Sequence, residues 1–272
     1  MKNIFRNNYT KFIIIFLILI VFVLLNTYFG VKNNKKILVT AHRGASLLYP
    51  ENTMSAFIGA KELGAKWIEL DVQQTKDRQI VVSHDSNIKR VTGIDRNIID
   101  MNYFELKEFD FGSFFNEKFK DERIPLLDEV LVFAKNNNIN LNIELKPNGR
   151  EINFEKQVID LIKKYNYENK CVVASFDYNA IKNVKKIDKD IKTVYLMSSI
   201  IDDIETLNYA DVYSIESSII NKDLVTKIHN LGKEIYAWTV NTKKGINKMI
   251  NLNVDNIITD DVKLANELVN VY

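Results

Sequence analysis

Cysteine is almost absent from this sequence. Cys171 is the single cysteine among 272 residues, which excludes an internal disulfide framework and any metal cluster built on several cysteines. It lies in an apolar run at 171–174, a setting typical of a buried structural thiol. Any metal site in this chain must therefore use other ligands.

An excess of charge of one sign is also lacking. Lysine and arginine number 37 against 35 aspartates and glutamates, which gives a formal net charge of +2. A balance so close to neutral does not indicate a nucleic-acid partner. The 46% hydrophobic content is normal for a globular protein.

One long apolar run stands apart from the rest of the chain. Residues 12–25 carry no charge, and residues 26–31 extend the run to about 20 residues, roughly what a bilayer span requires. A cleaved signal peptide is the alternative, although Asn26–Gly30 offers no clear pair of small residues for cleavage. A buried core helix would have a polar face, which this run lacks.

We therefore predict an N-terminal membrane anchor and short linker at 1–36, followed by one domain at 37–272. Three basic residues flank the run on each side, so the positive-inside rule determines the orientation only weakly. A short N-terminus inside is the simpler insertion, and it predicts a single-pass membrane protein with its domain outside the cytoplasm.

From residue 37 onward, short β-type runs alternate with longer segments of helical period. The predicted strands are Ile37–Ala41, Trp67–Val72, Ile80–His84, Asn140–Leu145, Val172–Ser175, Thr193–Leu196, Val212–Ile215, Ile235–Val240 and Asn256–Ile258. The predicted helices are Met54–Leu63, Leu127–Asn136, Phe154–Tyr165, Tyr178–Ile187, Lys222–Leu231 and Lys243–Leu252. This alternation over about 235 residues predicts a (β/α)8 TIM barrel.

The predicted barrel is irregular at two places. Nine strand candidates compete for eight positions, and residues 73–79 are too few for a crossover helix, so one strand is surplus or lies outside the ring. Residues 87–123 fit no strand–helix unit and carry several aromatic residues. This insertion either covers the active-site face or forms a small packed excursion with its own aromatic core.

Two of the three histidines close apolar runs. His42 follows the first predicted strand, and His84 ends the third. Glu69 and Asp71 end the run between them. Strand ends that carry such residues predict one chemically active rim of the barrel. The third histidine, His229, lies on an ordinary predicted helix and is interpreted as structural.

The carboxylates of this rim are expected to point into the barrel. Residues two apart share one face of a strand, so Glu69 and Asp71 point the same way, as do Asn142, Glu144 and Lys146. The apolar residues between them must pack on helices, as parallel strands require. The carboxylates therefore face inward, where they repel one another strongly.

A cation is the usual remedy for such repulsion. Three oxygen donors, Glu69, Asp71 and Glu144, suit one divalent ion, Ca²⁺ or Mg²⁺. Ion pairs with Arg43 and Lys146, with no metal, are the alternative. His42 and His84 beside these carboxylates indicate acid–base work. A divalent ion with two bases and two cations is typical of phosphodiester hydrolysis rather than glycoside hydrolysis.

A series of short segments runs in a distinctive order and spacing from residue 39 to residue 261. It includes His42-Arg43-Gly44-Ala45, Pro50-Glu51-Asn52-Thr53, Glu69-Leu70-Asp71-Val72, Ser83-His84-Asp85, Asn142-Ile143-Glu144-Leu145-Lys146, Trp238-Thr239-Val240-Asn241 and Thr259-Asp260. In this order and spacing the segments resemble a known family, the glycerophosphodiester phosphodiesterases. One departure is Arg78, where the family usually has glycine.

The resemblance implies a TIM-barrel enzyme that cleaves glycerophosphodiesters to sn-glycerol 3-phosphate and an alcohol. By position, Glu69, Asp71 and Glu144 would hold the metal, His42 would be the general base and His84 the general acid. The substrate would contact Arg43 and Lys146 at its phosphate and Trp238 at its glycerol, with Glu51 a weaker candidate.

Several alternatives stay open at this point. The nucleophile is either water or the 2-hydroxyl of the substrate's own glycerol. The substrate is a small glycerophosphodiester, a lysophospholipid cleaved by a lysophospholipase D, or a glycerol-phosphate polymer of the envelope. A barrel that binds a phosphodiester or lipid headgroup without cleaving it is the non-enzymatic alternative.

Overall fold

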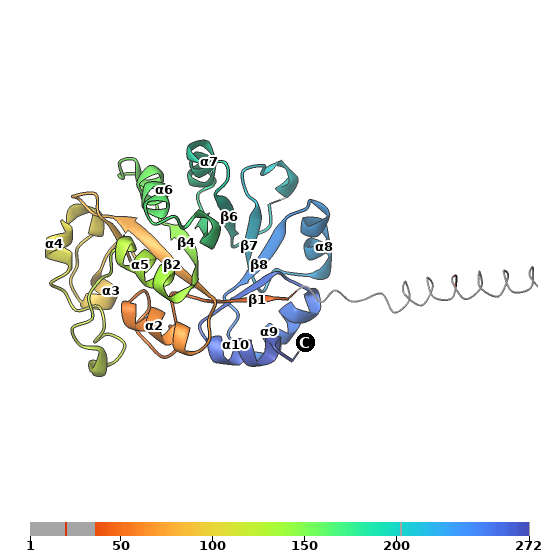
Figure 1. Cartoon of the computed structure of the whole chain (residues 1–272), viewed down its shortest axis with the longest axis horizontal. Coiled ribbons are helices and arrows are strands. Elements are labelled where there is room, and N and C mark those ends of the chain that lie inside the picture. Colours follow the sequence, from red (N-terminus) through yellow and green to blue (C-terminus); the bar gives the residue numbers. More distant parts are fainter. Residues whose placement is uncertain (1–19, 21–35, 202, 272) are drawn as a thin grey trace, which may run out of the picture. The chain divides into compact units, whose positions relative to one another are not determined.

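Eight parallel strands close into a barrel in the computed structural model, which describes residues 20, 36–201 and 203–271 (Figure 1). The strands are β1 (Leu38–Ala41), β2 (Trp67–Gln74), β4 (Asn140–Leu145), β5 (Cys171–Ser175), β6 (Lys192–Met197), β7 (Val212–Glu216), β8 (Glu234–Trp238) and β9 (Asn256–Thr259). Their order is β1-β9-β8-β7-β6-β5-β4-β2, and pairing of β1 with β2 closes the ring. The predicted TIM barrel is confirmed.

The surplus strand is β3 (Ile80–Val82), which lies outside the ring. It runs antiparallel to the end of β2, with Val72 opposite Val82 and Gln74 opposite Ile80. The linker is too short for the crossover that a parallel strand needs, so the chain turns back as a hairpin. Arg78 in this turn has φ 63, a left-handed conformation in which glycine is the least strained residue.

Helices surround the barrel between the strands (Figure 1). They are α2 (Met54–Glu62), α5 (Leu127–Asn137), α6 (Phe154–Lys164), α7 (Tyr178–Ile187), α8 (Lys222–Asn230), α9 (Lys243–Leu252) and α10 (Val262–Val269). Side chains cap several N-termini, among them Thr53, Asp177 and Asn221, which satisfies backbone N–H groups that have no partner within the helix. All six predicted helices are present, and α10 is an addition.

The main apolar core lies between the strands and the helices. Ile68, Leu70 and Val72 of β2 are fully buried and belong to one cluster with residues of α5 and α6. Because these three residues face outward, the residues between them face into the barrel. This is the arrangement that the sequence alternation predicts.

The insertion at 87–123 consists of short elements. They are α3 (Lys89–Thr92), α4 (Tyr103–Leu106) and two 3-10 turns, Ile98–Asp100 and Glu117–Phe119. A separate apolar cluster holds the segment together, with Ile88, Ile98 and Met101 fully buried. The insertion therefore has its own core, packed around Val81 of β3.

The predicted membrane anchor at 1–36 lies almost entirely outside the described residues. Among the helices that the structure does describe, none has both the length and the apolar character needed to cross a bilayer.

Candidate active site

Three buried carboxylates converge inside the barrel. The register between β2 and β4 places Asp71 opposite Glu144, and Glu69 opposite Asn142. The exposed fractions of Glu69, Asp71 and Glu144 are only 4%, 1% and 8%. Each offers one oxygen, and these oxygens lie within 4.8 Å of one another. The predicted inward carboxylate cluster is therefore present.

Two cations lie against this cluster. Arg43 Nε is 3.4 Å from Asp71 Oδ2. Lys146 Nζ is 3.5 Å from Asp71 Oδ1 and 3.0 Å from Glu144 Oε1. Asn52 Nδ2 also donates a hydrogen bond to Asp71 Oδ2 at 2.8 Å. Arg43 and Lys146 therefore do make the ion pairs of the metal-free alternative, yet they leave the cluster one positive charge short of neutrality.

The pKa values of the carboxylates reflect this deficit. Burial, followed by the charges of Asp71 and Glu144, raises the pKa of Glu69 well above its usual range. Burial and the neighbouring Asp71 raise the pKa of Glu144 to about 8. Against the effect of burial, Arg43 and Lys146 lower the pKa of Asp71. Glu69 and Glu144 are thus shifted toward the protonated state, and a bound cation would oppose this shift.

The donor set fits a hard divalent cation. Carboxylate oxygens are preferred by Ca²⁺ and Mg²⁺, and buried Asp71 Oδ1 receives no hydrogen bond from any described residue. A divalent ion held by Glu69, Asp71 and Glu144 would give the cluster, together with its two cationic neighbours, a single positive charge. Such a site attracts a phosphodiester anion.

His42 is oriented by an aspartate from the last strand. It follows β1, and its Nδ1 lies 2.7 Å from Asp260 Oδ1. Although burial opposes ionisation, hydrogen bonds from His42, Ser46 and Asn241 lower the pKa of Asp260. An ionised carboxylate can only accept hydrogen bonds, so Nδ1 of His42 donates to Asp260 and Nε2 is the nitrogen turned to the carboxylate cluster. That Nε2 lies 4.0 Å from Glu69 Oε2.

His84 has a matching partner in its own segment. The β2–β3 hairpin projects beyond the rim and returns, so that the backbone N–H of Ser83 bonds to Asp71 O at 2.9 Å and His84 reaches the site. His84 Nδ1 lies 2.7 Å from Asp85 Oδ1. Burial and the cations Arg43 and Lys146 lower the pKa of His84, which makes its imidazolium a stronger proton donor.

The loop after β1 brings the main chain into the site as well. Arg43 has φ 54, and its backbone N–H donates to Glu69 Oε2 at 2.8 Å. Arg43 Nη1 donates to Glu51 Oε1 at 2.9 Å. Gly44 has φ 83, and a Cβ there would come within 2.7 Å of Ala56. The loop therefore packs directly on α2 and holds Arg43 over the carboxylates.

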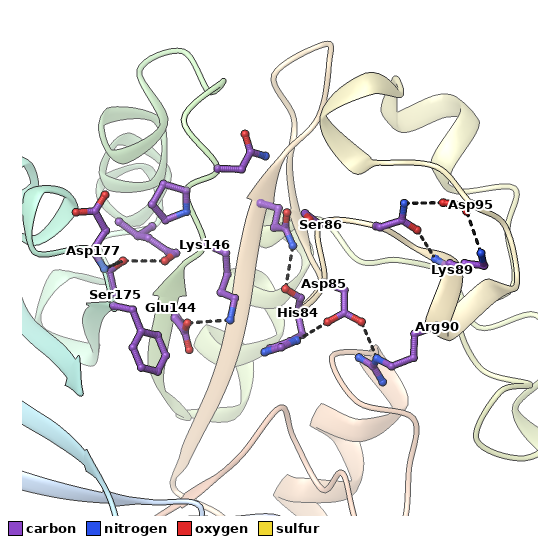
Figure 2. A pocket seen from close by; sticks show the side chains of 16 residues that line it. His84, Asp85, Ser86, Lys89, Arg90, Asp95, Glu144, Lys146, Ser175 and Asp177 are labelled. Atoms are coloured by element: carbon purple, nitrogen blue, oxygen red, sulfur yellow. Dashed lines mark hydrogen bonds and ion pairs between the residues drawn. The ribbon is translucent and has the colours of Figure 1, made fainter. Parts of the chain in front are cut away.

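Two cavities meet at the carboxylate cluster. The smaller has a volume of about 160 Å³ and is lined by His42, Glu69, Trp238 and neighbouring residues. The larger, of about 920 Å³, extends toward the insertion (Figure 2). His84, Glu144, Lys146 and Phe176 line both. A diester with its phosphorus near the shared residues could place one substituent in each cavity.

The structure brings most of the predicted site residues together. His42, Arg43, Glu69, His84, Glu144, Lys146 and Trp238 line the smaller cavity, and Asp71 lies against Arg43 and Lys146. Trp238 donates its Nε1–H to Ser214 O at 3.0 Å and packs edge-on against Phe176, with ring centroids 5.5 Å apart. Glu51 is bound between two arginines, and it lines neither of these two cavities in the described structure.

Several residues that contact the predicted site residues were given no role by the sequence reasoning, and three of them lie next to the histidines and the carboxylates. Asp260 and Asp85 hold the two histidines, and Asn52 bonds to Asp71. Asp85 could have been found, because it directly follows His84. Asp260 is 218 residues from His42, and only the closure of the barrel by β1 and β9 makes them neighbours.

Comparison with known proteins identifies close relatives. The sequence profile of the Glycerophosphoryl diester phosphodiesterase family matches residues 42–264. A glycerophosphodiester phosphodiesterase from Caldanaerobacter subterraneus subsp. tengcongensis is 38% identical over 239 residues, which cover 86% of this chain and 98% of that protein. A human lysophospholipase D is 36% identical over 167 residues, covering 59% of this chain and 52% of that protein.

Solved structures agree with the sequence comparison. A phosphodiesterase from Oleispira antarctica, in complex with the product sn-glycerol-3-phosphate, superposes with a TM-score of 0.81 at 28% identity. The superposition covers 86% of this chain and 96% of that chain.

Proposed function

The chain belongs to the glycerophosphodiester phosphodiesterase family, and from this premise we propose that it hydrolyses glycerophosphodiesters to sn-glycerol 3-phosphate and an alcohol by cation-assisted acid–base catalysis with two histidines. The observation that carries the proposal is the convergence of three buried carboxylates and two histidines, each held by an aspartate, at one rim of the barrel.

Positive charge at the rim is the first requirement of this chemistry. When bound by Glu69, Asp71 and Glu144, a divalent cation supplies charge stabilisation for the phosphoryl oxygens. Arg43 and Lys146 add to it from the protein, since both contact Asp71 and both line the smaller cavity. Fixed charges of this kind stabilise the additional negative charge of the transition state.

Proton transfer is assigned to the histidines. His42, through its Nε2, takes the proton of the nucleophile. His84 gives a proton to the oxygen of the leaving alcohol, and the lowered pKa of its imidazole favours that donation. The nucleophile is either water or the glycerol 2-hydroxyl, the latter giving a cyclic phosphate first.

The two cavities suggest how the substrate is placed. The smaller cavity, of about 160 Å³, has charged side chains on one side and apolar ones such as Trp238 on the other, which suits the hydroxyl groups and the carbon chain of the glycerol moiety. The larger cavity would then receive the alcohol. Since a human relative is a lysophospholipase D, a lysophospholipid is the second candidate substrate, and a glycerol-phosphate polymer is the third.

We also propose that the apolar run at 12–31 anchors the chain in a membrane, with the barrel on the extracytoplasmic side. The support is the length of the run and its freedom from charge between residues 12 and 31. An anchored barrel would work close to lipid or wall substrates.

A substrate panel tests the proposed function. The full chain, with Ca²⁺ or Mg²⁺, is assayed on glycerophosphocholine, lysophosphatidylcholine and a glycerol-phosphate oligomer, with sn-glycerol 3-phosphate and free choline as readouts. We expect the highest kcat/KM on glycerophosphocholine, with the two products formed in equal amounts. If lysophosphatidylcholine is the one substrate of the three that releases choline, the lysophospholipid replaces glycerophosphocholine as the proposed substrate. If none of the three gives a product, the proposal is rejected.

A further inference from the structure

Arg90 lies in the insertion, outside the barrel, and still reaches the site. It belongs to α3 and lines the larger cavity, where Figure 2 shows it beside Asp85 and His84. Its guanidinium contacts two carboxylates from different parts of the chain. Nε donates to Asp85 Oδ2 at 2.6 Å, while Nη2 and Nη1 donate to the two oxygens of Glu51 at 2.7 and 3.1 Å.

Each of these carboxylates has a second partner in the predicted machinery. Asp85 holds Nδ1 of His84 at 2.7 Å through its other oxygen. Glu51 accepts a hydrogen bond from Arg43 Nη1 at 2.9 Å. Arg90 is therefore the central member of a chain of contacts that runs from His84 to Arg43.

We propose that Arg90 is a positioning residue, which orients His84 through Asp85 and Arg43 through Glu51. The inference rests on the proposed function, because His84 and Arg43 have their roles in that reaction. Arg90 itself is assigned no contact with the substrate. An arginine suits this place, since its planar fork can bond to two carboxylates at once, whereas a lysine presents a single point charge.

The orientation of His84 follows from the contacts of Asp85. With Arg90 on one oxygen, the other oxygen of Asp85 is aimed at the imidazole. The carboxylate accepts, so Nδ1 of His84 must donate, and Nε2 is the nitrogen presented to the substrate. Without Arg90, Asp85 could rotate toward solvent, because about 30% of its side chain is already exposed.

The insertion holds Arg90 firmly in this place. Its neighbours Ile88 and Val91 are buried in the apolar cluster of the insertion, at 0% and 7% exposure. The backbone around Arg90 is thus fixed by packing, while its side chain extends toward the rim. On this account the insertion supplies part of the catalytic geometry, as well as one wall of the larger cavity.

Steady-state kinetics provide the first test. With glycerophosphocholine as the substrate, we expect Arg90→Ala to lower kcat by about tenfold, the usual order of effect for a residue that orients a catalytic group. KM should change by less than about threefold. Arg90→Lys should recover only a minor part of the loss. The control is Arg96→Ala, from the same insertion, whose ion pair with Glu105 is 3.5 Å long and exposed; it should behave as wild type.

Removal of both linking carboxylates separates indirect from direct action. In a background that carries Asp85→Ala and Glu51→Ala, Arg90→Ala should lower kcat by less than about threefold, because the links to His84 and to Arg43 are already broken. An equal loss in both backgrounds would overturn the proposal. So would a tenfold rise in KM with unchanged kcat, since that would make Arg90 a substrate ligand.

A spectroscopic readout keeps the test independent of turnover. The sequence has three histidines, so the imidazole nitrogens can be assigned by NMR with His84→Gln as reference. We expect a protonated Nδ1 for His84 in wild type and loss of that fixed tautomer in Arg90→Ala, with His42 unaffected. If the alanine variant does not fold, Arg90→Met, which keeps the apolar part of the side chain, should also lose the fixed tautomer of His84. An unchanged His84 signal in either folded variant contradicts the proposal, even if the wild-type chain cleaves no glycerophosphodiester.

Discussion

Glu144 shows most clearly how the fold prepares a cation site. The pairing of β2 with β4 places Glu144 directly opposite Asp71, so two carboxylates lie together in the buried interior of the barrel. Burial and that neighbour raise its pKa to about 8, although Lys146 Nζ is 3.0 Å away. The ionised carboxylates of Glu144 and Asp71 therefore repel each other, and either a proton or a bound cation reduces that repulsion.

A pH dependence of stability follows from this residue. Between its ordinary pKa of 4.5 and the folded value of about 8, the folded chain keeps a proton on Glu144 that the unfolded chain loses. The free energy of unfolding contributed by this residue therefore falls as the pH rises through that range. Excess Ca²⁺ should weaken the fall, because the cation replaces the proton.

Urea unfolding of wild type and Glu144→Gln at pH 5, 6, 7 and 8 measures this effect. In the presence of a chelator, wild type should lose stability relative to the variant as the pH rises, and in excess Ca²⁺ it should lose less. A difference between the two proteins that is the same at pH 5 and pH 8 would speak against a raised pKa for Glu144.

At the scale of elements, the loop between β1 and α2 is the most tightly constrained part of the site. Arg43, Gly44 and Asn52 all have positive φ, and the loop carries both the Arg43 side chain and the Arg43 N–H that binds Glu69. The close packing of Gly44 on Ala56 of α2 leaves no room for a side chain. The loop can keep this path only with glycine at 44.

Gly44→Ala should therefore destabilise the chain and reduce activity. Gly149→Ala is the matched control, because Gly149 has nearly the same φ, 87 against 83, but nothing within 4 Å of an added Cβ. Both variants suffer backbone strain, and the clash should cost Gly44→Ala about 1–3 kcal/mol more. Thermal unfolding and kcat report the difference. Equal losses in the two variants would show that the contact with α2 does not hold the loop.

The elements also show what could be predicted from the sequence. Alternation within β2 and β4 was enough to place Glu69, Asp71 and Glu144 inside the barrel, because a two-residue period decides the face. The direction of β3 could not be read from its apolar run, since a short strand has the same pattern in either direction. Only the pairing of Val72 with Val82 reveals the hairpin that brings His84 back to the rim.

Contacts between distant segments were beyond sequence reasoning for a different physical reason. Arg90 and Glu51 are separated by 39 residues, and Ser46 and Asp260 by 214. Charged residues are common on surfaces, so no local pattern distinguishes these pairs from solvated ones. The Arg90–Glu51 pair forms only when the insertion packs beside the rim, and the Ser46–Asp260 pair only when β9 closes the ring next to β1.

For the molecule as a whole, the active rim is assembled from parts far apart in sequence. β1, β2, β4, β8 and β9 contribute residues that lie within these strands or directly after them, the hairpin adds His84, and the insertion adds Arg90. This agrees with the general place of active sites in barrels of this type. It also means that the charge balance of the site belongs to the assembled barrel and to no single segment.

The most direct test of this account is the release of sn-glycerol 3-phosphate from glycerophosphocholine by the full chain, before and after chelation. We expect a chelator to stop the release and Ca²⁺ or Mg²⁺ to restore it. With cation present, His42→Ala and His84→Ala should lower kcat by about 10²–10⁴-fold while their thermal unfolding stays close to that of wild type. Undiminished release in the chelator, or wild-type kcat in either histidine variant, would contradict the account.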